Sequence, residues 1–307
     1  MTAKRDTLRA TVLAVWLGLG MVPGVVGAAH AQPADGICVT DDAEREVCLG
    51  APATRIVALS PGVTELLFAA GAGERVVGAV SFSDYPAAAE DLPRVGSYDR
   101  LDLEALLALA PDLIVAWAGG NPREQVERLA ALGLPVYFSD AGDFAAIATS
   151  LERLGALAGS EAHGRAAADR LRGEVAELRS RYADAVPVSV FYQVWDEPLM
   201  TVNGDHWISR ALSLCGGENP FADESPLVPR IGREAVLARD PEAIITGGMG
   251  KADSSWLDAW RDFPELTAVR RDNLFFVDPD LVQRATPRLV EGTRALCAHL
   301  ETARERR

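Results

Sequence analysis

Short apolar runs recur through residues 55–138, separated by longer segments that mix apolar and polar positions. Runs of this length that end at turn-forming residues are typical of buried strands. They lie at Arg55–Leu59, Val76–Val80, Leu113–Trp117 and Val136–Phe138. We expect Ser60-Pro61-Gly62 to break the first run.

Helical periodicity fills the segments between these runs, at about residues 64–71, 101–109 and 123–132. Thr64 is the expected N-cap of the first helix, while Pro111 and Gly133 follow the ends of the other two. Strands that alternate with helices indicate a parallel α/β fold.

The pattern changes at Ala145, after which nearly 40 residues carry no strand signal. Good helix formers dominate there, and apolar residues recur at helical spacing from Leu171 to Tyr182. This predicts one long helix at about Glu161–Ala183, and the strand–helix alternation resumes at Val188. The fold class expected is therefore α/β, with two Rossmann-like lobes joined by one long helix.

An internal similarity supports two related lobes. Residues 101–115 (LDLEALLALAPDLIV) resemble residues 231–245 (IGREAVLARDPEAII), with Glu104 matching Glu234. The alternative is that any helix–proline–strand junction has this pattern. If the similarity reflects a repeat, each lobe presents one glutamate at the same place, and the ligand of a two-lobed protein binds in the cleft between lobes.

The N-terminus has the features of a cleaved export signal. Lys4, Arg5 and Arg9 precede an apolar run to about Val26, and Ala29-His30-Ala31 is a small-residue cleavage pattern. A transmembrane anchor is the alternative, but the run is slightly short for one. The cleavage site has no cysteine that could carry a lipid anchor, so a lipid anchor is not indicated. We therefore expect a soluble periplasmic protein.

These patterns together predict five segments along the chain. They are a signal peptide (1–31), a hairpin segment (32–54), a first α/β lobe (55–158), a linking helix (159–184) and a second α/β lobe (185–307). A net charge of −14 argues against nucleic acid as a partner, because an acidic protein gains no counterion-release energy there.

Four cysteines in an exported chain indicate two disulfides, and three pairings are possible. Cys38 with Cys48 is favoured because the residues between them resemble a short hairpin around Asp41-Asp42, which leaves Cys215 with Cys297. No close C-x-x-C pairs occur, and the histidines are scattered, so no metal site is expected.

No catalytic or nucleotide-binding motif is convincing, although Ser60 after a strand leaves an exported α/β hydrolase as a remote alternative. Aromatic residues instead stand at strand ends, where α/β sheets open toward their ligands. The candidates are Phe82, Tyr85, Tyr98 and Trp117. Core packing is the alternative, and it fits Tyr98 and Trp117 less well because Gly, Asn and Asp surround them. Such rings suit a large planar ligand.

Asp280 and Arg284 are the polar candidates in the second lobe. At i and i+4 they can form a surface ion pair of little energetic value, or they can present an acceptor and a donor to ligand amides.

Several segments together resemble a known family. They are SPGVTELLFAAG, SFSDYP, LDLEALLALAPDLIVAWAGGN, CGGENPF, REAVLARDPEAIITGG and RATPR. They are similar, in order over about residues 55–300, to the cobalamin-binding branch of the helical-backbone (class III) periplasmic solute-binding proteins. That family's fold is two α/β lobes joined by a rigid helix, and its members deliver their ligand to an ABC importer.

The resemblance implies a non-enzymatic, monomeric carrier of cobalamin or a related corrinoid, with no catalytic cofactor. It implies ligand contacts from Phe82, Tyr98, Trp117, Asp280 and Arg284, a disulfide between Cys215 and Cys297, and docking to the permease through Glu104 and Glu234. A family tryptophan falls on Val228 and a family phenylalanine on Met200, with Trp195 near enough to compensate, so Trp195 and Met200 are also expected to contact the ligand. An iron-siderophore or haem binder of the same fold remains the alternative.

Overall fold

The computed structural model describes residues 36–248 and 255–307. The expected signal peptide lies outside these residues. The strands are β1 Ile37–Thr40, β2 Glu46–Leu49, β3 Ile56–Ala58, β4 Val76–Ala79, β5 Gly96–Ser97, β6 Arg100–Leu101, β7 Leu113–Trp117, β8 Val136–Ser139, β9 Val188–Gln193, β10 Gly217–Glu218, β11 Ala243–Thr246 and β12 Leu274–Phe276.

The helices fill the segments between the strands. They are α1 Pro61–Ala69, α2 Leu103–Ala108, α3 Arg123–Ala131, α4 Phe144–Leu157, α5 Glu161–Arg181, α6 Trp207–Leu214, α7 Arg233–Arg239, α8 Ser255–Asp258, α9 Thr267–Arg270, α10 Pro279–Val282 and α11 Leu289–Glu305, with 3₁₀ turns η1 Gly73–Arg75, η2 Ala87–Ala89 and η3 Ala259–Asp262. None of the helices in the described part combines the length and the hydropathy that a bilayer span requires.

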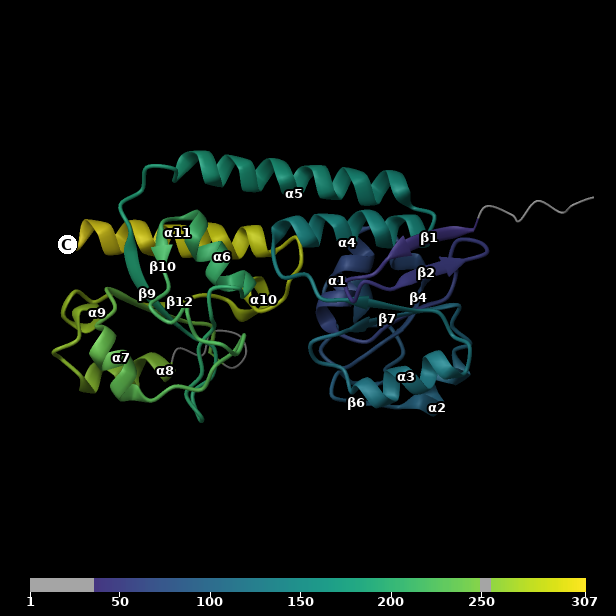
Figure 1. Ribbon diagram of the computed structural model, residues 1–307, viewed down its shortest axis with the longest axis horizontal. Coiled ribbons are helices and arrows are strands. Elements are labelled where there is room, and N and C mark those ends of the chain that lie inside the picture. Colours follow the sequence, from purple (N-terminus) through teal and green to yellow (C-terminus); the bar gives the residue numbers. More distant parts are fainter. Residues whose placement is uncertain (1–35, 249–254) are drawn as a thin grey trace, which may run out of the picture. The chain divides into compact units, whose positions relative to one another are not determined.

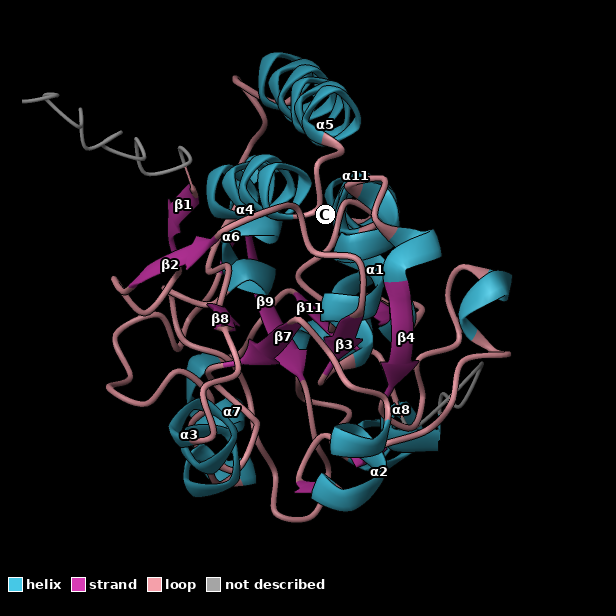
Figure 2. Ribbon diagram, turned by 90° about the vertical axis from the view of Figure 1, so that its right-hand side faces the viewer, coloured by secondary structure: helices cyan, strands magenta, loops and turns pink. Residues whose placement is uncertain are grey.

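Two four-stranded parallel sheets form the frame, in the orders β4-β3-β7-β8 and β10-β9-β11-β12. When the four strands of each sheet are counted in chain order, the second lies at one edge in both sheets, followed by the first, third and fourth. Helices lie above and below the strands in Figure 2, so each sheet has two faces to bury, which explains its nearly continuous apolar strands. The predicted α/β fold class is confirmed.

The long helix α5 runs along the top of Figure 1 and passes over both halves, with α4 packed along it. Its bounds, Glu161–Arg181, agree with the predicted helix at about 161–183. Gly159, at φ +64°, separates α4 from α5. Because this backbone conformation is rarely adopted by other residues, the glycine sets where the linking helix begins.

The start of α1 differs from the prediction. Ser60 is the N-cap, its hydroxyl accepts the Val63 N–H at 3.1 Å, and Pro61 is the first helical residue. The expectation that Thr64 caps the helix was therefore wrong. Proline at this position has its φ preset for a helix and no N–H to leave unpaired, so the helix can begin directly after the strand.

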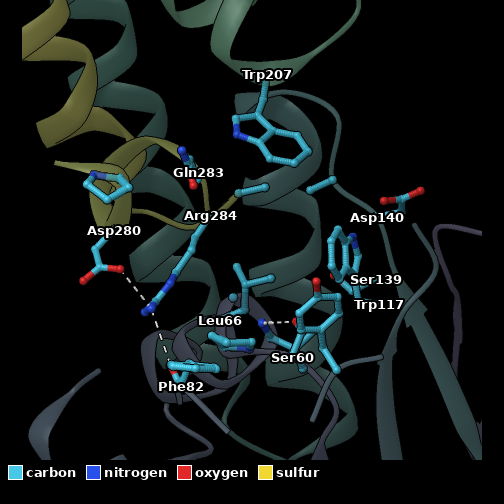
Figure 3. A pocket seen from close by; sticks show the side chains of 17 residues that line it. Ser60, Leu66, Phe82, Trp117, Ser139, Asp140, Trp207, Asp280, Gln283 and Arg284 are labelled. Atoms are coloured by element: carbon cyan, nitrogen blue, oxygen red, sulfur yellow. Dashed lines mark hydrogen bonds and ion pairs between the residues drawn. The ribbon is translucent and has the colours of Figure 1, made fainter. Parts of the chain in front are cut away.

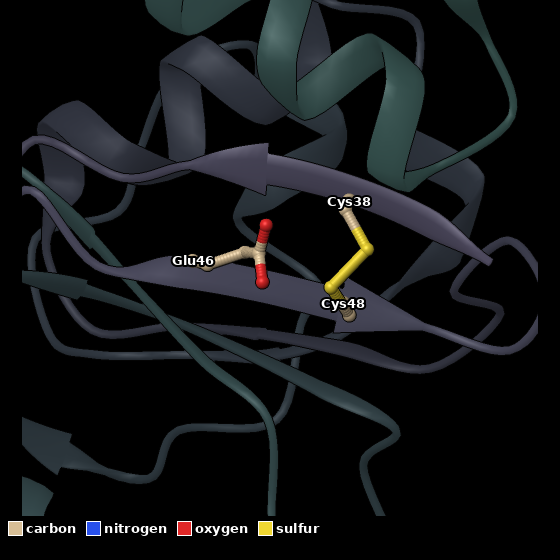
Figure 4. Close-up of side chains that lie close together, drawn as sticks. All are labelled: Cys38, Glu46 and Cys48. Atoms are coloured by element: carbon tan, nitrogen blue, oxygen red, sulfur yellow. A yellow bond between two sulfur atoms is a disulfide. The ribbon is translucent and has the colours of Figure 1, made fainter.

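The N-terminal hairpin β1–β2 pairs Cys38 directly with Cys48, and a disulfide joins them. Figure 4 shows Glu46 on the same hairpin beside both sulfurs. Sulfurs joined in a disulfide are not thiolates, so this group does not offer the sulfur ligands that a zinc site uses. Cys215 and Cys297 form the second disulfide, so both expected pairings are confirmed.

The turn of this hairpin covers the edge of the first sheet. Asp41 is fully buried and accepts the Phe138 N–H at 3.1 Å, while Arg45 donates to the Val136 carbonyl at 2.9 Å. Strand β8 is the edge strand there, and these bonds satisfy groups that would otherwise be open to pairing. The hairpin also reaches the next loop, because Asp42 accepts the Asp140 N–H at 2.8 Å.

Candidate functional site

A cavity of about 330 Å³ lies where the two halves face each other (Figure 3). The first half lines it with residues at or beyond the carboxyl ends of its four parallel strands, and the second half with the start of α6 and the segment around α10. The lining residues are Ser60, Pro61, Gly62, Val63, Leu66, Phe82, Tyr98, Trp117, Ser139, Asp140, Ala141, Trp207, Pro279, Asp280, Gln283, Arg284 and Ala285. Parallel strands of an α/β sheet present their ligand sites at these carboxyl ends.

Three aromatic rings form the wall contributed by the first half. Trp117 and Tyr98 have ring centroids 5.8 Å apart with a tilt of 52°. Phe82 is 72% exposed and holds a positive φ of 65°. A non-glycine residue in this region stores backbone strain, which is found most often at functional sites. The strain here presents an apolar ring to solvent at the rim of the cavity.

Asn121 holds this aromatic wall in place. Its side-chain oxygen accepts the Trp117 N–H at 2.7 Å, and its amide donates to the carbonyls of Leu59 at 2.8 Å and Tyr98 at 2.7 Å. One nearly buried amide thus ties two ring-bearing segments to the end of β3. Gly120 is required beside it, because a Cβ there would lie 2.1 Å from the Trp117 ring.

Asp140 stands next to Trp117 on the same wall. Burial raises the pKa of Asp140, the hydrogen bond from the Trp117 side chain lowers it, and the nearby Asp42 carboxylate raises it, so that the pKa lies above its usual value. Since Asp42 also holds the Asp140 backbone, the N-terminal hairpin contributes indirectly to the wall of the cavity.

The second half contributes a more polar wall. Asp280, Gln283 and Arg284 line the cavity, and Arg284 forms an ion pair with Asp280 at 3.0 Å. The indole N–H of Trp207 donates to the Val282 carbonyl at 2.8 Å, which fixes the one aromatic ring that the described part of the second half contributes to the lining.

His206 packs against the ring of Trp207. It is the N-cap of α6, where its Nδ1 accepts the Ile208 N–H at 3.2 Å, and its ring lies 3.9 Å from the Trp207 ring. Burial lowers the pKa of His206 to about 3. The imidazole is therefore neutral at physiological pH, as an acceptor at a helix N-terminus must be.

The structure brings together five of the seven ligand contacts expected from the sequence, namely Phe82, Tyr98, Trp117, Asp280 and Arg284. It does not bring Trp195 or Met200 to the cavity. Trp195 packs edge-on against Trp256, with ring centroids 6.0 Å apart, and donates its indole N–H to the Glu197 carbonyl. The backbone of Met200 forms isolated β-bridges with Trp195 and Arg230.

Sequence reasoning missed Trp207, Gln283 and Asp140. Trp207 follows the turn-like Asn203-Gly204-Asp205 and stands at a helix start, which was the available signal. The two glutamates expected to dock a partner, Glu104 and Glu234, are exposed, and each is the second residue of its helix. Both helices, α2 and α7, lie on the side away from α5 in Figure 1.

Comparison with known proteins identifies the family of this chain. The sequence profile described as periplasmic binding protein matches residues 56–281. A vitamin B12-binding protein of Yersinia pestis is 37% identical over 248 residues, which cover 81% of this chain and 86% of that protein.

Solved structures share the fold. The periplasmic vitamin B12-binding protein BtuF of Vibrio cholerae superposes with a TM-score of 0.76 at 36% identity, covering 83% of this chain and 99% of that one. The periplasmic heme-binding protein RhuT of Roseiflexus sp. RS-1 has a TM-score of 0.72 at 23% identity, covering 81% and 98%. At that identity the likeness concerns the fold alone. The chain belongs to the periplasmic binding protein family.

Proposed function

We propose that this protein binds vitamin B12 or a related corrinoid in the cavity between its halves and delivers it, chemically unchanged, to an ABC importer. One observation carries the proposal. An aromatic wall and a polar wall face each other in one cavity, in a chain 36% identical to a vitamin B12-binding protein of solved structure. The lobes proposed are residues 55–158 and 185–307, joined by residues 159–184.

The aromatic wall supplies the contact area. A flat macrocycle resting on Phe82, Tyr98 and Trp117 gains about 1.5–3 kcal/mol for each ring that it buries fully. A cavity of about 330 Å³ is at the lower end of the range for drug-sized ligands, so a corrinoid is expected to extend beyond it, across the exposed Phe82.

The polar wall supplies orientation. Asp280 and Gln283 offer acceptors for the amide groups at the edge of a corrinoid, and Arg284 lines the cavity beside them. Trp207 covers the ligand from the second half. Trp195 and Met200 are not part of this proposal.

A hydrolase is disfavoured by the geometry of Ser60. Its hydroxyl accepts the Val63 N–H as a helix cap. Within residues 36–248 and 255–307, no histidine or carboxylate forms a hydrogen bond with it, whereas a nucleophilic serine needs such a base.

Isothermal titration with cyanocobalamin tests the proposal, together with gel filtration of the mixture. We expect saturable one-to-one binding and a red protein peak after desalting. Haemin and a ferric siderophore serve as comparison ligands. A protein that binds either of these and leaves cyanocobalamin free would refute the proposal.

Delivery is tested separately through the two exposed glutamates. In a vesicle assay with its cognate importer, Glu104→Ala with Glu234→Ala is expected to reduce cobalamin uptake about tenfold or more, while titration shows unchanged binding. Charges at the edge of an interface set orientation and partner choice. Neither substitution changes a residue that lines the cavity. Uptake at the wild-type rate would remove the docking assignment.

A further inference from the structure

Charged groups from both halves meet beside the cavity. Arg284 and Arg288 come from the segment after α10, Glu65 from α1, and Asp84 from the loop after β4. Arg284 donates from Nη1 to Glu65 at 2.7 Å and to Asp84 at 2.9 Å. Arg288 donates to both oxygens of Glu65, at 3.0 and 2.7 Å. With Asp280, these residues are called the charged cluster.

The centre of the charged cluster is shielded from water, whereas Asp84 lies at its edge and is 44% exposed. The Glu65 side chain is 2% exposed, and those of Arg284 and Arg288 are 14% and 16% exposed. The ring of Tyr85 lies 3.8 Å from the Arg288 guanidinium. Charges are screened less in such a place than on the surface, so the balance of charge within the cluster acts on whatever enters the cavity.

That balance is negative. Three carboxylates, Glu65, Asp84 and Asp280, surround two guanidinium groups. Burial alone lowers the pKa of Arg284, but the hydrogen bonds to Glu65 and Asp84 outweigh it and raise that pKa, so the guanidinium stays charged. One negative charge remains in excess at the polar wall.

Both terminal nitrogens of Arg284 are already engaged. An arginine that lines a cavity is ordinarily a strong site for ligand carboxylates, which it binds through paired N–H groups. Here Nη1 is shared between Glu65 and Asp84, and Nη2 faces Asp280 at 3.0 Å and the Phe82 carbonyl at 3.4 Å. A ligand carboxylate would have to displace one of these carboxylates.

We propose that Glu65 and Asp84 determine which ligand charge this cleft accepts: by occupying Arg284 and Arg288 they admit a neutral, amide-edged macrocycle and exclude one edged with carboxylates. The inference rests on the proposed function, because it concerns the same cavity. It assigns specificity to two residues of the aromatic half that contact the arginines.

The experiment measures a ratio of affinities. Cyanocobalamin is the amide-edged probe, and dicyanocobyrinic acid, whose peripheral amides are carboxylates, is the anionic probe. The wild type should bind cyanocobalamin more tightly than the acid. In Glu65→Gln with Asp84→Asn, the ratio should shift toward the acid by about tenfold or more, because two carboxylates no longer compete for the arginines. The shift should shrink at high salt.

Two control variants isolate the charge effect. Glu152→Gln with Glu174→Gln removes the same charge from exposed ion pairs with Arg172 and Arg294, remote from the cavity lining, and should leave the ratio unchanged. Glu65→Gln with Arg288→Gln removes one charge of each sign and should shift the ratio less than the double carboxylate variant.

If Glu65→Gln with Asp84→Asn fails to fold, a single substitution still tests the proposal. Removing a buried partner can be strongly destabilising, whereas Asp84 is 44% exposed, so Asp84→Asn alone should fold and shift the ratio about threefold. A ratio within about twofold of the wild type in every folded cluster variant would overturn the inference, as would an equal shift in the Glu152 and Glu174 control. Haemin, a dicarboxylate tetrapyrrole, tests the same charge rule without a corrinoid. If the wild type does not bind cyanocobalamin, the proposed function fails. In that case, gain of haemin binding by the cluster variants and not by the wild type would still support the charge rule.

Discussion

The two halves of the protein share a strand order but carry different chemistry at the ends of their strands. Each is a four-stranded parallel sheet with its second strand at one edge. In the first half, residues at or beyond the ends of all four strands reach the cavity and include three aromatic rings. In the second half, the described part reaches the cavity only through the start of α6 and the segment around α10. One scaffold therefore provides a stacking surface on one side and a polar surface on the other.

The internal similarity noticed in the sequence agrees with this comparison. The segments that include Glu104 and Glu234 form α2 and α7, each of which leads into the third strand, in chain order, of its four-stranded sheet, β7 or β11. What the halves share thus faces away from the linking helix, while what distinguishes them faces the cavity. The halves should therefore respond differently to matched substitutions, both in stability and in binding.

The largest expected effect concerns the two disulfides. Cys38–Cys48 closes a loop of 10 residues within one hairpin, whereas Cys215–Cys297 closes one of 82 and joins the end of α6 to α11. By loop-closure entropy, replacing each pair with alanine should cost about 3 and about 4.5 kcal/mol of unfolding free energy, respectively. Urea denaturation of the two double variants checks the order. A hairpin variant less stable than the other would show that packing outweighs loop length.

The next effect concerns the aromatic wall. Trp117→Ala should weaken cyanocobalamin binding by about 1.5–3 kcal/mol, or roughly 10- to 150-fold, since a lining ring is lost. Trp195→Ala is the matched change in the second half and should alter the dissociation constant less than about twofold, because its ring packs on Trp256 outside the cavity. Titration of both variants decides. Similar losses from both would mean that the ligand also contacts the Trp195 ring, which is not among the residues that line the cavity.

These residues also show what sequence could predict. Trp117 and Tyr98 were found because an aromatic residue at a strand end, surrounded by Gly and Asn, has few reasons to be in the core. Trp207 and Gln283 were missed because their position depends on how the second half faces the first. The pairing of Arg284 with Glu65 spans 219 residues, and no local pattern signals a contact of that separation. Local sequence patterns predicted the helices and strands, whereas the site depends on how the two halves assemble.

The misplaced helix cap has the same kind of cause. Ser60 and Thr64 are both good capping residues, and only the fixed φ of Pro61 decides between them. The corresponding position in the second half, the cap of the helix after its first strand, is occupied by His206. The halves therefore differ at this position in a group that titrates.

That difference predicts a pH dependence of stability. Burial lowers the pKa of His206 in the folded state to about 3, below the value of about 6.5 expected when unfolded. The unfolded chain binds this proton first as the pH falls, so the contribution is fully present above pH 6.5 and is lost toward pH 3. Between pH 7 and 5 the wild type should lose about 1–2 kcal/mol more unfolding free energy than His206→Asn, which keeps a capping side chain.

Denaturant titrations at several pH values measure this difference. His299 is also buried with a lowered pKa, but it is present in both proteins and cancels in the comparison. Parallel pH profiles for the two proteins would mean that His206 does not couple to unfolding. Ser60→Asn, the matched change in the first half, should leave the shape of the profile unchanged.

The smallest effect concerns the polar wall. Gln283→Leu keeps the size of the side chain and removes its amide, so it should weaken cyanocobalamin binding by about 0.5–1.5 kcal/mol, or roughly 2- to 12-fold, for one neutral hydrogen bond. The loss should disappear for a corrinoid whose peripheral amides are methyl esters, because an ester has no N–H to donate to the Gln283 oxygen. Since Trp117→Ala should weaken both ligands alike, the two variants together separate stacking from amide recognition. An equal loss for both ligands in Gln283→Leu would show that this residue acts through packing, and the contrast between an aromatic wall and an amide-reading wall would then rest on Asp280.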